Sequence, residues 1–274
     1  GHAVYASDTS FVTLTNSGTE VARLQLTHSN PVMKNNENRF LTYGIGSSSY
    51  EISSFDETLY SGNAENKIYT GDVASNGTYC LVTEDNGYLT TLYAYSKNNN
   101  RIYKYSFSEY YITSVAINKD GSGCVATGVS SDKGSAVTGV YVLDFSQEKP
   151  VSTYKISGDS VLDCKYLTSD TAVLVGSQAS YIVKNYKTVS YEDKTLSNYC
   201  FNTDTSTYTM ALSRSGDGRS VALISYNSNG EAQYTINTEH KADSLSVYKG
   251  TVAILDGNVV YGYNQNGDLL YSTN

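Results

Sequence analysis

The chain has 274 residues, 39% of them hydrophobic and 17% charged, and 27 Asp and Glu against 19 Lys and Arg give a formal charge of −8 at pH 7. This negative balance makes phosphate polymers poor partners, so we expect no nucleic-acid binding. Apolar runs are short and broken by polar residues, and none approaches the roughly 18 residues of a membrane-spanning helix, so we expect no membrane insertion by the chain itself.

Composition favours an all-β fold. The chain contains 27 Tyr and 22 Gly but only 2 Pro and no Trp. Tyr, Thr and Val favour half-buried pleated surfaces, whereas strong helix formers are scarce.

The first alternating segments predict three strands, at residues 2–6, 10–14 and 20–26. Later segments contain four strands each, so the first unit lacks one, and a segment upstream could supply it. The chain begins Gly1-His2-Ala3-Val4 without Met. This start leaves room for a signal peptide or membrane anchor upstream.

Two later units predict the complete four-stranded plan. The expected strands are 71–75, 78–83, 88–96 and 101–107, then 112–118, 123–129, 136–145 and 150–156, and the last strand of the chain is 268–273. Pro150 at the start of a strand suits an outer edge, where a missing backbone donor matters least.

Pairs of Asn or Asp with Gly separate many of these runs and predict tight two-residue hairpins between antiparallel strands. The pairs are Asn76-Gly77, Asn86-Gly87, Asp120-Gly121, Asp217-Gly218, Asn229-Gly230, Asp256-Gly257 and Asn266-Gly267.

A repeat runs through the chain. Seven expected hairpins lie 37 to 48 residues apart, with their centres at Gly18, Glu57, Asn99, Gln147, Lys187, Gly230 and Gly267. A period of about 40 to 45 residues with several short strands is typical of propeller blades. We therefore predict a single domain over residues 1–274, a seven-bladed β-propeller of four-stranded antiparallel blades with the first blade possibly incomplete. Six or eight blades, or a β-sandwich or barrel, are the alternatives.

The tyrosines fit this architecture as packing between blades, with each ring filling the space and its hydroxyl reaching an edge or a buried backbone group. The alternative is an aromatic platform for a ligand, which the absence of Trp disfavours.

Four cysteines follow the period. Cys80 and Cys124 are expected on the second strands of two blades, and Cys164 and Cys200 on the first strands of the next two. Their spacing lacks any C-x-x-C pair, so we expect buried thiols and no metal site, with a disulfide between blades as the alternative.

Two histidines, His28 and His240, both follow the last strand of a blade. They are expected on the same rim in neighbouring blades, as solvated loop residues or as a metal or acid–base pair. Nucleophile, P-loop, zinc-protease and calcium-loop motifs are absent from the sequence. Asp72 and Asp163 begin first strands, where single Asp residues more often bind loop backbone than catalyse.

Several hairpins share one sequence motif: a polar residue, then Asn or Asp, then Gly, followed by an alternating strand. This motif resembles the outer hairpin of quinoprotein-like and WD-repeat-like propellers. The WD dipeptide is absent, the one GH dipeptide is Gly1-His2 at the start of the chain, and Tyr234 and Tyr271 stand where the quinoprotein blade has Trp. These departures lead us to expect no quinone or other cofactor. The chain is also similar to uncharacterised extracytoplasmic propeller domains that Gram-positive bacteria anchor in the membrane.

The resemblance implies a non-enzymatic scaffold outside the cytoplasm, anchored through an N-terminal segment that the sequence does not include. It would bind a protein or cell-envelope component through the loops that join one blade to the next. The alternative is a glycan-acting hydrolase or lyase with Asp72 and Asp163 as acid and base. We assign no catalytic residue, and the candidate binding residues are His28, Tyr110, Tyr111, Asp159, Glu239 and His240.

Overall fold

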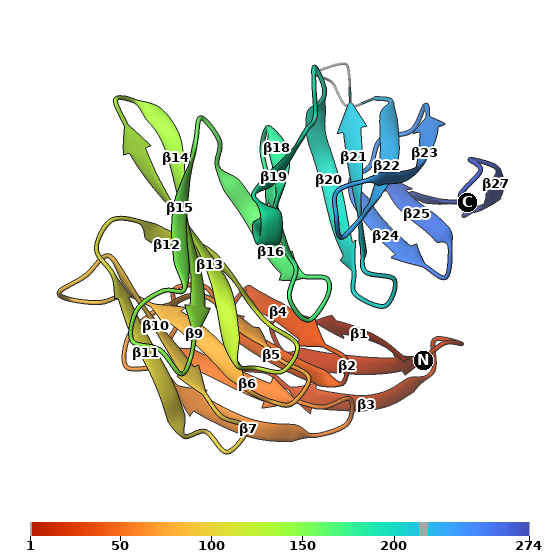
Figure 1. The fold of residues 1–274 in the computed structure, drawn as a ribbon. Coiled ribbons are helices and arrows are strands. Elements are labelled where there is room, and N and C mark those ends of the chain that lie inside the picture. Colours follow the sequence, from red (N-terminus) through yellow and green to blue (C-terminus); the bar gives the residue numbers. More distant parts are fainter. Residues whose placement is uncertain (1, 214–218, 274) are drawn as a thin grey trace. The chain divides into compact units, whose positions relative to one another are not determined.

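Short alternating runs and tight turns build seven antiparallel sheets in sequence order in the computed structural model, which describes residues 2–213 and 219–273 (Figure 1). Hydrogen-bonded strands are neighbours in sequence throughout, so every sheet is a meander. These sheets are the blades of a seven-bladed β-propeller, which confirms the predicted fold class. The described residues contain no α-helix, and the one helical turn is the 3₁₀ segment η1 (Val183–Asn185).

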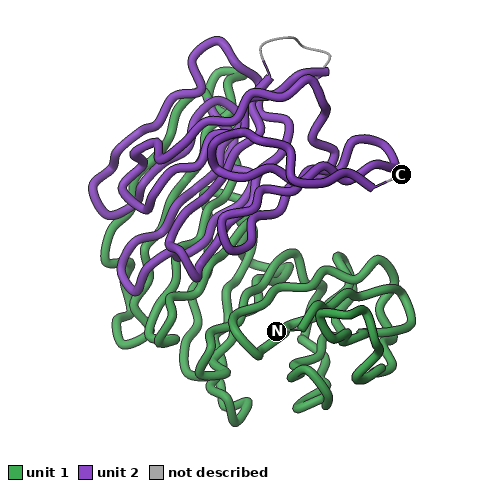
Figure 2. The backbone as a smooth tube through the Cα atoms, turned by 90° about the vertical axis from the view of Figure 1, so that its right-hand side faces the viewer, with its two compact units in different colours: residues 1–158 green, residues 159–274 purple. Residues whose placement is uncertain are grey.

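The chain divides after Gly158 into two compact units, which are described separately (Figure 2). The single domain expected over residues 1–274 stays a prediction.

The first unit holds four sheets. Their strands are β1 (His2–Ala6), β2 (Ser10–Thr15) and β3 (Glu20–Gln25); β4 (Pro31–Asn36), β5 (Arg39–Gly44), β6 (Ser49–Ser53) and β7 (Thr58–Asn63); β8 (Ile68–Val73), β9 (Tyr79–Thr83), β10 (Thr90–Tyr95) and β11 (Arg101–Phe107); and β12 (Tyr111–Ile117), β13 (Gly123–Asp132), β14 (Ser135–Asp144) and β15 (Ser152–Ser157). The three-stranded first sheet confirms the incomplete first blade.

The second unit holds three sheets of four strands. They are β16 (Val161–Tyr166), β17 (Ala172–Gly176), β18 (Ala179–Ile182) and β19 (Lys187–Ser190); β20 (Thr195–Asn202), β21 (Thr207–Ser213), β22 (Val221–Asn227) and β23 (Ala232–Thr238); and β24 (Ser244–Tyr248), β25 (Thr251–Asp256), β26 (Val259–Tyr263) and β27 (Leu269–Ser272).

The predicted two-residue hairpin is found at Asp256-Gly257, where Asp256 pairs with Val259, but the turn at Asn229-Gly230 is wider than predicted. In the β22–β23 hairpin, the Gly230 N–H donates to the Asn227 carbonyl at 2.9 Å, and Gly230 has φ +69°. The ladder shifts register between Ser225 and Tyr226, which marks a bulge. Only the glycine of this Asn-Gly pair needs a positive φ, because a turn followed by one left-handed residue replaces the two-residue hairpin. The pair Asp217-Gly218 lies outside the described residues.

Some predicted strand starts are wrong by two or three residues. The strand predicted from residue 71 is β8, which begins at Ile68, and Pro150 lies in the loop before β15, which begins at Ser152. The missing N–H of proline is thereby kept out of the ladder.

Neighbouring sheets bury their apolar faces against each other within each unit. Met210 and Leu212 of β21 pack with Val173 and Val175 of β17, and all four side chains are at most 2% exposed. Burying one such side chain contributes about 1.5–3 kcal/mol, so this face-to-face packing is the main stabilising term.

Ten tyrosines are buried, and several find hydroxyl partners there. Tyr50 and Tyr79 share a hydroxyl–hydroxyl bond of 3.0 Å, and the Tyr191 hydroxyl donates to the Gly176 carbonyl at 3.0 Å. The predicted packing role is confirmed for these residues.

All four cysteines are free and lie on the predicted strands: Cys80 on β9, Cys124 on β13, Cys164 on β16 and Cys200 on β20. Cys80, Cys124 and Cys164 are buried, and Cys200 is partly buried. Partial burial raises the pKa of the Cys200 thiol to about 11.

Candidate functional site

His28 lies in the connection from β3 to β4 and is buried, with 2% of its surface exposed. Its Nδ1 is 3.0 Å from Ser49 Oγ at the start of β6, and its Nε2 is 3.8 Å from Glu51 Oε1. Burial lowers the pKa of His28 and raises the pKa of Glu51. The expectation of a solvated rim histidine is therefore wrong, because this side chain ties the connection to the sheet that follows.

Asp159 lies in the connection from β15 to β16 and is 3% exposed. Its carboxylate accepts hydrogen bonds from the backbone N–H groups of Ser177, Gln178 and Ala179 at 2.8 to 3.2 Å, and from the Tyr181 hydroxyl at 2.8 Å. With the Ser177 hydroxyl at 2.7 Å, five donors engage this carboxylate over the β17–β18 turn.

His240 follows β23, and its ring stacks on Tyr261 at 3.6 Å between centroids. Its Nδ1 is 3.4 Å from Asp256 Oδ2, at the β25–β26 turn. His28 and His240 belong to different units, and each has a carboxylate partner of its own. The connections at Asp159 and His240 thus contact the turn between the second and third strands of the next sheet, and the connection at His28 contacts the third strand, β6.

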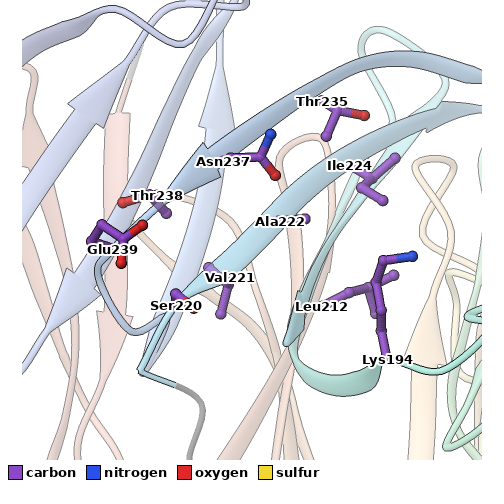
Figure 3. Close-up of a pocket in the computed structure, with 10 residues that line it drawn as sticks. All are labelled: Lys194, Leu212, Ser220, Val221, Ala222, Ile224, Thr235, Asn237, Thr238 and Glu239. Carbon is purple, nitrogen blue, oxygen red and sulfur yellow. The ribbon is translucent and has the colours of Figure 1, made fainter. Parts of the chain in front are cut away.

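Glu239 is exposed and lines a cavity of about 560 Å³ in the second unit (Figure 3). Ala222, Ile224, Thr235 and Asn237 of β22 and β23 line it as well. No aromatic ring lines this cavity among the described residues.

The two candidate carboxylates of the hydrolase hypothesis both bind backbone. Asp72 is 1% exposed and accepts from the Ile117 N–H at 3.0 Å, and Asp163 accepts from the Cys164 N–H at 2.9 Å. The preferred interpretation, hydrogen bonding to loop backbone, is confirmed only in part: both residues bind backbone N–H groups, but Ile117 ends β12 and Cys164 lies within β16.

Tyr110 and Tyr111 differ in how much of each side chain is exposed. Tyr111 begins β12 and is 53% exposed, whereas Tyr110 is half-buried. Tyr110 lines a groove of about 570 Å³ in the first unit, between β11 of one sheet and β14–β15 of the next. This tyrosine groove is lined by Tyr105, Ser106, Phe107, Ser108, Glu109, Tyr110, Gly139, Tyr141, Lys149, Pro150, Thr153, Tyr154 and Lys155.

The Tyr110 ring packs on a pair of glycines. Gly128 of β13 and Gly139 of β14 are direct partners across the ladder. A Cβ at Gly139 would lie 2.5 Å from Tyr110 Cδ2, and a Cβ at Gly128 would lie 2.8 Å from Tyr110 Cβ. The ring therefore fills the space that two missing side chains leave, which fixes its position on the sheet.

Three tyrosine rings surround the groove. The centroid of Tyr141 lies 6.2 Å from that of Tyr105 and 6.1 Å from that of Tyr110. Burial and the nearby Glu109 carboxylate raise the pKa of Tyr141 to about 12, so its hydroxyl stays protonated. None of the three hydroxyls forms a hydrogen bond to any described residue, and Tyr141 is 8% exposed.

Charged side chains flank the rings. Lys149, Lys155 and Glu109 are exposed, and none of them forms an ion pair within the described part of the chain. The sequence identified Tyr110 but not the groove, because Tyr105 and Tyr141 come from different blades.

Within residues 2–213 and 219–273, no three His, Cys, Asp or Glu side chains gather as metal ligands would. The same residues include no helix with the length and apolar character that crossing a bilayer requires.

Comparisons with known proteins support the fold. The sequence profile of a family described as "Family of unknown function (DUF5711)" matches residues 1–274. No curated protein matches the sequence.

Solved structures share the architecture at low identity. A functionally unknown protein from Desulfotomaculum acetoxidans DSM 771 superimposes with a TM-score of 0.68 at 11% identity, covering 99% of this chain and 95% of that one. The Dos1 propeller gives 0.66 at 9% identity, with 94% and 73% covered. The C-terminal WD40 domain of Sif2 gives 0.60 at 16% identity, with 90% and 71% covered. The predicted resemblance to propellers is confirmed at the level of the fold.

Proposed function

Because the chain belongs over its whole length to the DUF5711 family of unknown function, we propose a role from the site itself: a non-enzymatic scaffold that binds a protein or cell-envelope partner in the tyrosine groove. The observation that carries this proposal is the set of three tyrosines, at residues 105, 110 and 141, that line one groove and whose hydroxyls form no hydrogen bond among the described residues. Tyrosine is enriched at binding hot spots because it combines a large apolar ring with a polar tip.

The groove is also ordered in advance of binding. Tyr110 is held by the glycine pair, and Tyr105 and Tyr141 pack on Phe107 with centroids 4.9 Å away. Rings that are already fixed lose little side-chain entropy when a partner arrives. Of the residues expected to bind, His28 and Asp159 are occupied inside the fold, so the proposal rests on Tyr110.

Photocrosslinking tests the site. A photoreactive phenylalanine analogue placed at Tyr110 of the full chain should form an adduct in the native cell. The same analogue at Tyr88, a tyrosine that is 52% exposed and outside the groove, is the matched control. Equal adducts at both positions, or none at Tyr110, would contradict binding at the groove.

We further propose that the protein acts outside the cytoplasm, as the resemblance to anchored propellers implies. Cys80, Cys124 and Cys164 are buried, so a Ser131→Cys variant places a new thiol on the exposed tip of the β13–β14 hairpin. A membrane-impermeant maleimide should label this variant in intact cells, with the parent chain as the control. Labelling only after lysis would refute the location.

A further inference from the structure

Resting on the proposed function, the geometry points to the class of ligand: we infer that the tyrosine groove binds a proline-rich segment in the polyproline II conformation, with an acidic side chain beside Lys149 and Lys155. A polyproline II chain has no internal hydrogen bonds, and proline has no N–H. Such a ligand offers carbonyl acceptors and apolar rings but few donors.

The groove is complementary to this ligand. The hydroxyls of Tyr105, Tyr110 and Tyr141 can donate to peptide carbonyls, and their ring faces can pack against proline rings. Glu109 is the one carboxylate among the described lining residues, and the lining hydroxyls of Ser106, Ser108 and Thr153 can accept as well as donate. An aromatic groove with such polar edges suits a ligand in the polyproline II conformation.

The three rings form one continuous aromatic surface. Tyr141 lies 6.2 and 6.1 Å from its two neighbours, Tyr105 and Tyr110. A polyproline II helix has three residues per turn and rises about 3.1 Å per residue, so one side of the ligand recurs about every 9.3 Å. Proline rings on that side can meet the aromatic surface once per turn.

The charge beside the groove favours an acidic residue next to the prolines of the ligand. The chain as a whole carries a charge of −8, yet two unpaired ammonium groups, Lys149 and Lys155, stand beside the groove. An acidic side chain there meets local positive charge on a chain that is negative overall. A basic side chain at the same place is disfavoured by like-charge repulsion.

Fluorescence anisotropy with the full chain tests the inference. The probe is a labelled octapeptide of two Pro-Pro-Pro-Glu repeats, and the comparison peptides replace proline by alanine or glutamate by lysine. The proline–glutamate peptide should bind with a Kd on the order of 10 to 100 µM and at least about 10-fold more tightly than either comparison peptide.

Variants locate the binding. Tyr110→Ala should weaken binding about 10-fold, and Tyr110→Phe, which keeps the packed ring and removes only the hydroxyl, about 3-fold. Lys149→Ala with Lys155→Ala should weaken binding roughly 3- to 10-fold and reduce its salt dependence. Tyr88→Ala, outside the groove, should leave the Kd unchanged.

Equal affinity for the proline and alanine peptides, or proline-peptide binding that is indifferent to Tyr110→Phe and to the lysine pair, would overturn the inference. Binding of a soluble peptidoglycan fragment that depends on Tyr110, together with no response to the proline peptide, would overturn it while upholding the groove as a binding site. Failure of the Tyr110 photocrosslink would overturn both proposals.

Discussion

Removing the Asp159 carboxylate should loosen the second unit at the β17–β18 turn. In Asp159→Ala, the N–H of Ala179, which is 6% exposed, and the hydroxyl of Tyr181 lose their charged acceptor, whereas the N–H groups of Ser177 and Gln178 can turn to water. Each hydrogen bond to a charged group contributes about 1.5–3 kcal/mol, so the two donors that stay in the fold predict a loss of about 3–6 kcal/mol. Asp159→Asn keeps one acceptor and should lose less, about 1–3 kcal/mol.

Denaturant unfolding of the full chain, followed with native-state hydrogen exchange at the Ala179 amide, measures this loss. Local opening at the turn should accelerate exchange there before global unfolding does. Asp193→Ala, an exposed carboxylate in the same unit, is the control. An Asp159→Ala variant within about 0.5 kcal/mol of the parent chain, the scatter of ordinary surface substitutions, would refute the bracing role.

Three further predictions concern other parts of the chain. Burial lowers the folded-state pKa of His28, so the unfolded chain takes up a proton near pH 6.5 that the folded chain does not, and stability falls as the pH drops below about 6.5. In urea unfolding, the difference in free energy of unfolding between the parent chain and His28→Gln should therefore shrink by up to about 1.4 kcal/mol per pH unit. A difference that stays constant with pH would contradict this. Gly139→Ala should displace the Tyr110 ring from its packing on Gly139, which would shift the NMR resonances of that ring and lower the free energy of unfolding by about 1–3 kcal/mol. Unchanged ring resonances would refute this packing. Thiol titration without reductant should find four reactive groups after unfolding, and fewer would mean a disulfide that the structure does not contain.

The repeat was predictable because strand alternation and turn residues are local signals. The predicted strand 101–107 coincides with β11, and 112–118 differs from β12 by one residue at each end. The turn type was not predictable in the same way, because Asn-Gly suits both a two-residue hairpin and a bulged one. Gly230 resolves this only through the register shift that its neighbours adopt.

Candidate site residues were harder to predict. His28 and Asp159 look like free loop residues in the sequence, since their partners Ser49 and Ser177 are 18 to 21 residues away. The tyrosine groove was missed because Tyr105 and Tyr141 are 36 residues apart and belong to different sheets. Packing between blades decides which faces of two strands contact each other. The alternating pattern of a single strand does not specify this contact.

The boundary between the two compact units offers a practical division of the chain. The Gly158 N–H donates to the Ala136 carbonyl in the first unit, whereas every acceptor bond described for Asp159 comes from the second. Gly158 itself is exposed with φ +80°, and no atom lies near its absent side chain. A reporter domain inserted between these two residues would interrupt none of these hydrogen bonds. Residue 158 is therefore the first place to try for split-protein complementation or a fluorescent insertion.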